Sequence, residues 1–248
     1  MFKECSSLLT VDVSGFDTSK VTAMDYMFYG CRKLVNVDVS GFDTSNVTCF
    51  ERMFSICPAL ESIDVSGFDT SKATNMSGFF AGCSSLKKID VSSFDTRNVT
   101  DISYMFNECS SLTELDISSF STSQCKNMIG MFEYCRNLTY LNTSHLSTAS
   151  AENIDSMFLE CEKLTSIDLS NFSTSHVEGS YPASGIISGC DSLKSINMSS
   201  LDISNNKSPY FFSGLASLVE IYVPTGINVA LELPRRDGMA WVNSENEI

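Results

Sequence analysis

Apolar residues return along this chain at a fixed interval of 26 residues. Two series of phenylalanines keep this interval, and a cysteine series keeps it until a last step of 29 residues. The cysteines are Cys5, Cys31, Cys57, Cys83, Cys109, Cys135, Cys161 and Cys190. A period of this size is typical of a solenoid, whose units stack because none can bury its apolar face alone.

One unit, from Cys31 to Cys57, contains two different patterns. In residues 37–40 apolar and polar residues alternate, which predicts a short strand with one buried face in the segment around residues 34–40. In residues 47–57 the apolar spacing lengthens to three, three and four residues, which predicts a helix of about two turns. Thr48 lies three residues before Glu51, the spacing of a capping box at a helix start.

We therefore predict an α/β repeat fold, a right-handed curved solenoid with a parallel sheet on one face and short helices on the other. Curvature is expected because helices are wider than strands. The solenoid should occupy residues 1–223, and residues 224–248, where the period is lost, should form a C-terminal cap or the start of a further domain. Because residues 1–5 align with the end of the next unit's predicted helix, we expect a fragment that begins inside a repeat.

The charge of the chain limits its partners. Thirty Asp and Glu residues face sixteen Lys and Arg residues, giving a formal net charge of -14. Nucleic acid and anionic membranes attract basic surfaces, so we expect neither as a partner, and no direct membrane insertion of this fragment.

The cysteine series is expected to be buried and reduced, because Leu215 fills the same position in the last unit. Cys49 and Cys125 lie three repeats apart, too far to form a disulfide. Neither a zinc site nor another cofactor is predicted, since there is no close cysteine pair. His145 and His176 lack a matching nucleophile or acid, so no catalytic residue is predicted.

Stacking should place equivalent residues of successive units in columns. One column is acidic or amidic, and two interpretations stay open: the carboxylates bridge Ca²⁺, or each accepts hydrogen bonds from its own turn. A threonine column either closes turns with its hydroxyls or forms a glycan- or ice-binding ladder. The acidic column is Asp12, Asp38, Asp64, Asp90, Asp116, Asn142, Asp168, Asn197 and finally Tyr222. The threonine column is Thr18, Thr44, Thr70, Thr96, Thr122, Thr148 and Thr174.

A third column, on the exposed side of the predicted strands, changes from unit to unit. Variation within a regular surface favours a role in partner specificity, and aromatic and charged side chains concentrate binding energy. The predicted partner-binding residues are Asn36, Lys88, Glu114 and Tyr140 of this column, together with Tyr222.

The repeat also resembles a known family. Residues 31–54 read CRKLVNVDVSGFDTSNVTCFERMF, and residues 83–106 read CSSLKKIDVSSFDTRNVTDISYMF. This unit resembles the repeat of BspA-like leucine-rich-repeat surface proteins, shared with Mycoplasma-type repeat lipoproteins, over residues 1–223. It departs from the usual leucine-rich repeat at Phe42, where an Asn or Cys is expected after the strand.

The resemblance implies a secreted or wall-attached protein of a bacterium, or of a microbial eukaryote that acquired the repeat. It implies adhesion to a host or microbial protein or glycan at the concave face, without catalysis. The alternative is a structural spacer that projects other domains from the cell surface.

Overall fold

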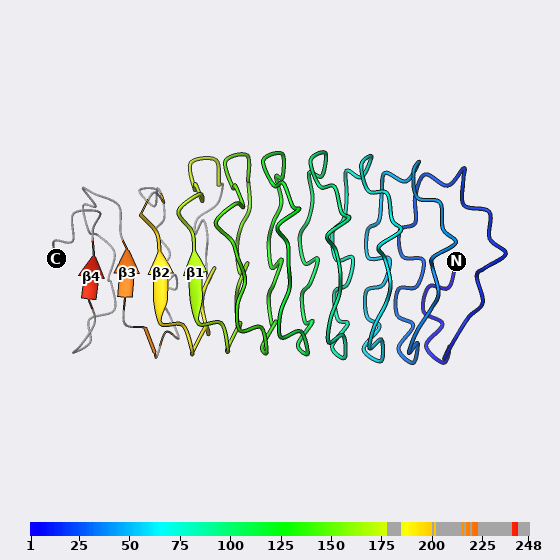
Figure 1. Cartoon of the computed structure of the whole chain (residues 1–248), viewed down its shortest axis with the longest axis horizontal. Coiled ribbons are helices and arrows are strands. Elements are labelled where there is room, and N and C mark those ends of the chain that lie inside the picture. The colour runs from blue at the N-terminus through cyan, green and yellow to red at the C-terminus, as the bar shows by residue number, and fades with distance from the viewer. Residues whose placement is uncertain are drawn as a thin grey trace.

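The computed structural model describes residues 1–177, 185–199, 201, 215, 217–218 and 220–222, and the backbone of 240–242. The chain winds into coils that stack side by side along one long axis (Figure 1). Successive coils are joined by main-chain hydrogen bonds between residues about one period apart: the Phe28 N–H donates to the Met53 carbonyl at 2.8 Å. Most of the predicted C-terminal cap, residues 224–248, lies outside the described residues.

The described residues contain four strands of three residues each: β1 (Ser166–Asp168), β2 (Ser195–Asn197), β3 (Glu220–Tyr222) and β4 (Ala240–Val242). They form one parallel sheet in the order β1-β2-β3-β4 (Figure 1). In the preceding coils the same face is extended but pairs more sparsely, with one isolated bridge between Glu114 and Tyr140. The predicted parallel sheet is therefore confined to the last described coils.

The alternation of buried and exposed residues on this face is confirmed. Val37 and Val39 are buried, whereas Asn36, Asp38 and Ser40 are exposed. We call this side of the coils the strand face, including the coils without a regular strand.

The prediction of an α/β fold with short helices is wrong, because the described part of the chain contains no helix. Where a helix was expected, the N–H groups of Arg52 and Phe54 donate to the next coil, at 2.8 and 3.0 Å. A helix would direct these groups to carbonyls four residues earlier in its own chain. The curvature predicted from wide helices loses its basis as well.

The apolar spacing that suggested helices comes from tight turns. The Cys31 N–H donates to the Phe28 carbonyl at 3.2 Å, and the Leu34 N–H donates to the Cys31 carbonyl at 3.0 Å. Each turn thus joins two residues three positions apart, and Phe28, Cys31 and Leu34 are all fully buried. The spacing of three reflects the turns rather than a helical pitch.

Two residues in each of these coils adopt a positive φ angle, which also interrupts a right-handed helix. In one coil they are Tyr26 at 55° and Gly30 at 71°. Glycine adopts this conformation without strain, but Ile56, at 58°, is β-branched and is an outlier there. The prediction of a capping box at Thr48 is therefore wrong as well, because no helix begins there.

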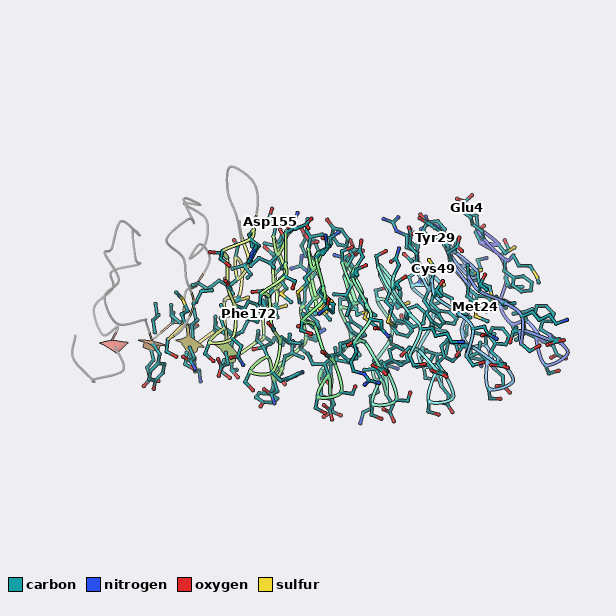
Figure 2. All side chains as sticks on the ribbon, turned by 90° about the horizontal axis from the view of Figure 1, so that it is seen from above. Glu4, Met24, Tyr29, Cys49, Asp155 and Phe172 are labelled. Carbon is teal, nitrogen blue, oxygen red and sulfur yellow. The ribbon has the colours of Figure 1, made fainter. Side chains whose placement is uncertain are left out.

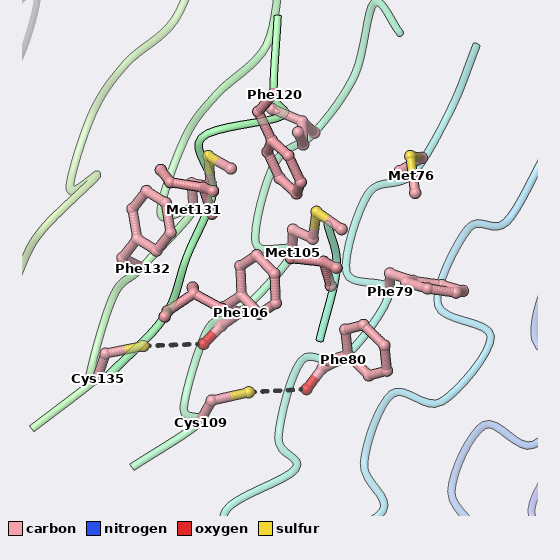
Figure 3. Packing of buried hydrophobic residues seen from close by; sticks show 14 of the residues in the cluster. Met76, Phe79, Phe80, Met105, Phe106, Cys109, Phe120, Met131, Phe132 and Cys135 are labelled. Carbon is pink, nitrogen blue, oxygen red and sulfur yellow. Dashed lines mark hydrogen bonds between the residues drawn. The ribbon is translucent and has the colours of Figure 1, made fainter. Parts of the chain in front are cut away.

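Phenylalanine rings form a continuous stack through the interior. The ring centroids of Phe80 and Phe106 lie 5.9 Å apart, as do those of Phe106 and Phe132, with nearly parallel planes (Figure 3). Phe94, which the sequence places inside, is 1% exposed. Stacked rings at this separation are favourable beyond the apolar area that they bury.

The predicted burial of the cysteine series is confirmed from Cys31 to Cys190, while Cys5 at the first coil is exposed. The ten cysteines are free. The buried thiols of the series donate hydrogen bonds to phenylalanine carbonyls of the preceding coil, whereas the Cys125 thiol donates to the Val99 carbonyl. Two of these bonds, Cys109 Sγ to Phe80 O at 3.3 Å and Cys135 Sγ to Phe106 O at 3.2 Å, are drawn in Figure 3. Burial raises the pKa of Cys135 to about 12.

The threonine column has a role that neither interpretation of the sequence anticipated. The Thr96 hydroxyl donates to the Ser121 carbonyl at 2.9 Å and accepts from the Ser121 N–H at 2.7 Å, in the next coil. The hydroxyls therefore link coils instead of closing their own turns. Being almost fully buried, the column cannot present a glycan- or ice-binding ladder. The same pair of bonds is made by Thr18, Thr44, Thr70, Thr122 and Thr148.

Replacing Thr96 with valine tests this link. Thr96→Val keeps the shape but leaves the Ser121 N–H and carbonyl without their partner, so we expect a loss of about 2 to 4 kcal/mol in the free energy of unfolding. Urea denaturation followed by circular dichroism measures the loss. The control, Thr96→Ser, keeps the hydroxyl and should lose only about 1 kcal/mol for the missing methyl. A valine variant as stable as the serine variant would contradict the proposed link.

Thiol labelling tests the cysteine assignment. At pH 8 the folded protein should react at Cys5, whereas the buried thiols should react slowly because they are inaccessible and because burial keeps them protonated. After denaturation without a reductant, all ten thiols should become reactive. Cys49 is partly exposed and should react at an intermediate rate in the folded protein. Cys5→Ser is the control and should remove the fast phase while leaving the reaction of Cys49. Fewer than two reactive thiols after denaturation would mean that the coils are joined by disulfides.

Candidate binding site on the strand face

The variable column lies on the surface of the strand face, as predicted. Asn36, Lys88, Glu114 and Tyr140 are exposed. Glu114 and Tyr140 are partners in a parallel bridge, so they occupy equivalent positions on adjacent coils. The column therefore presents a changing row of side chains along the solenoid axis.

Lys88 and Glu114 form an ion pair on this row. Lys88 Nζ lies 3.2 Å from Glu114 Oε1, and the two side chains are 79% and 72% exposed. Such exposed pairs contribute little to stability because water screens them. Both groups are thus accessible to a partner.

The acidic column follows the turn interpretation. The Ser40 N–H donates to Asp38 Oδ1 at 3.0 Å, and the Ser66 N–H and hydroxyl donate to Asp64 Oδ1 at 3.0 and 2.7 Å. Hydrogen bonds from Ser40, the side chain's first and then the backbone's, lower the pKa of Asp38. Within the described ranges, no three His, Cys, Asp or Glu residues are grouped as a metal site would require.

A hollow of about 260 Å³ opens on the strand face between two tyrosines. Tyr140, 61% exposed, borders it on one coil, and Tyr222, 39% exposed, borders it on β3. The lining consists of Tyr140, Leu141, Asn142, Thr143, Ser166, Ile167, Asp168, Ser195, Asn197 and Tyr222. Two predicted partner-binding residues therefore share one concave site.

Strand register explains why the surface is hollow here. In β1 and β2, Ser166 pairs with Ser195, so two small side chains lie side by side where other coils carry lysine, glutamate or tyrosine. On the neighbouring column Asn197 pairs with Tyr222, which brings that ring to the edge of the site. The two serines form the floor and the two tyrosines form the ends.

The structure does not bring all five predicted residues together. Lys88 and Glu114 lie on the coils just before Tyr140, outside the hollow, and Asn36 lies four coils before Tyr140. Sequence reasoning missed Asn142 and Asn197 as site residues. A signal existed, because these amides interrupt the acidic column in the coils that form the hollow.

The opposite edge of the coils carries Tyr29 and Asp155, away from the strands (Figure 2). A second hollow, of about 450 Å³, is lined by Ser84, Glu108, Ser110, Tyr134 and Arg136. Arg136 already pairs with Glu160 at 2.8 Å and with Glu162. Its charge is therefore neutralised within the protein, which makes this hollow a weaker candidate than the strand face.

None of the described residues belongs to a helix long and apolar enough to cross a membrane.

A search of curated proteins found no match. Two solved structures align with the chain at low scores. A leucine-rich repeat protein from Bacteroides ovatus ATCC 8483 is 18% identical, with a TM-score of 0.22, over 95% of this chain and 92% of that one. The functional domain of InlJ from Listeria monocytogenes, which includes a cysteine ladder, is 17% identical, with a TM-score of 0.20, over 88% of this chain and 49% of that one.

One family model matches residues 1–113 and 76–195, which together cover most of the chain. It describes a Mycoplasma protein of unknown function, DUF285. The match spans the coils whose turns, stacked rings and linking threonines are described above. The chain belongs to this Mycoplasma-type repeat family.

Proposed function

We propose that this chain is a non-enzymatic binding module at a cell surface, which holds a partner protein or glycan on its strand face. The observation that carries the proposal is the hollow between Tyr140 and Tyr222. Exposed aromatic rings beside a concave polar surface are common anchors in binding sites, because a ring buries a large area on contact.

Two further features support binding over catalysis. The hollow is lined by tyrosines, serines, a threonine, amides, two aliphatic residues and one carboxylate, Asp168, with no histidine or cysteine among them. The interior is occupied by packed rings and by hydrogen bonds between coils. Such an array offers a rigid surface whose side chains vary while the backbone stays constant.

The proposal places the module outside the cell, as adhesive surface proteins require. The similarity of the repeat to BspA-like surface proteins motivates this location. The charge of -14 supports a partner other than nucleic acid, since nucleic acid needs a basic footprint. A spacer would need no ligand, and replacing the side chains of the hollow would not affect its role.

Replacing Tyr140 with serine tests whether the chain acts as a binding module or as a spacer. A screen of the purified chain against immobilised matrix proteins and glycans should identify a ligand, and Tyr140→Ser should weaken its binding about tenfold, measured by surface plasmon resonance. The free energy of unfolding should change by less than about 0.5 kcal/mol, because the side chain is largely exposed.

Tyr29→Ser is the matched control, since Tyr29 lies on the opposite edge of the coils (Figure 2). It should bind as the unmodified chain does. Equal affinity of Tyr140→Ser and the unmodified chain would remove Tyr140 from the site. Absence of any ligand across the panel would favour the spacer.

A further inference from the structure

The charge of the strand face changes where the hollow begins. Five successive coils carry a carboxylate in the acidic column, from Asp12 to Asp116. The next residues of the column are Asn142, Asp168, Asn197 and Tyr222, and all four line the hollow. The two tyrosines therefore lie on the part of the strand face where most residues of the acidic column are no longer carboxylates.

Hydrogen bonds within each turn determine which polar atoms are left for a ligand. Asn142 Oδ1 accepts from the Ser144 N–H at 3.2 Å and from its hydroxyl at 2.8 Å, and Asn197 Oδ1 accepts from the Ser199 N–H at 3.1 Å. The remaining polar group of each amide is its NH₂, a donor. Asp168 lies on the coil between them.

Asp168 Oδ1 accepts from the Ser170 N–H at 2.8 Å, so Oδ2 remains as an acceptor. Along the column the order is thus donor at Asn142, acceptor at Asp168 and donor at Asn197, on coils roughly 4.8 Å apart. A ligand that matches this order must both donate and accept hydrogen bonds at neighbouring atoms. Adjacent hydroxyl groups on a sugar ring do both.

The dimensions of the site fit the same ligand. Tyr140 and Tyr222 are three coils apart, roughly 14 Å, and on the two coils between them the variable column carries the small side chains Ser166 and Ser195. The volume of about 260 Å³ is below the roughly 300 to 1,000 Å³ of pockets for drug-sized ligands, so the hollow holds one ring of a longer molecule. The C–H face of a sugar ring is apolar and packs flat on a tyrosine.

We propose that the hollow between Tyr140 and Tyr222 binds a neutral oligosaccharide, with hydroxyl groups bonded to Asn142, Asp168 and Asn197. An acidic glycan would be repelled by Asp168 and by the carboxylates of the preceding coils. This assignment rests on the proposed binding function and names the ligand class of that same site.

The test uses the purified chain and an array of neutral oligosaccharides, with sialylated and sulfated oligosaccharides as the charged comparison. Binding to a neutral member should be detected, and titration calorimetry should measure its affinity. Asn142→Asp should weaken it about tenfold, because the donor becomes an acceptor with a negative charge. The change preserves the turn, since aspartate makes the same turn bond in the preceding coils.

Asp90→Asn is the matched control. It makes the reverse exchange in the same column, away from the hollow, and should leave sugar binding unchanged. Tyr140→Ser should weaken sugar binding by a similar factor to Asn142→Asp. Circular dichroism of each variant verifies that the coils remain folded.

The outcomes separate this inference from the proposed function. If a protein ligand is found whose binding requires Tyr140 while no oligosaccharide binds at millimolar concentration, the binding function holds and the sugar assignment is wrong. Preference for charged glycans, or full affinity in both Asn142→Asp and Tyr140→Ser, would also overturn the assignment. If no ligand of either kind binds, both proposals fail.

Discussion

Hydrogen bonds between successive coils are the interaction on which the other features of this structure depend. In the segment of tight turns before each cysteine of the series, backbone N–H groups such as those of Arg52 and Phe54 donate to carbonyl groups of the next coil. The buried Thr96 hydroxyl adds two bonds to the next coil by acting as donor and acceptor together. These bonds fix the register, and the register aligns phenylalanine with phenylalanine and places Ser166 beside Ser195.

The sequence predicted the inside and the outside of the coils better than their local conformation. Val37 and Val39 are buried and Asp38 is exposed because alternation reports directly on which side chains avoid water. The stripe of Val47, Phe50 and Met53 is also buried, but its spacing of three is shared by a helix and by tight turns. Sequence spacing alone does not distinguish them, because the bonds that decide the outcome lie between coils.

The candidate site was predictable in part. Tyr140 was identifiable because it departs from the small residues of its column, and the structure places it at the opposite end of one hollow from Tyr222. The hollow itself depends on the pairing of β1, β2 and β3, which sets two serines next to each other across a step of 29 residues. The roles of Asn142 and Asn197 needed the turn bonds, which occupy one side of each amide.

The step of 29 residues from Cys161 to Cys190 has a consequence for how this architecture tolerates change in length. The Phe158 N–H donates to the Ile186 carbonyl, an offset of 28, where the offset in the preceding coil is 25, from Phe132 to Met157. The three additional residues lie between Val177 and Ile186, and the bonds before and after them remain in register. The array therefore keeps its coil-to-coil bonds across a change in the length of the chain between Val177 and Ile186, so an epitope or a fluorescent peptide inserted into this segment should leave the pairing of β1 with β2 intact.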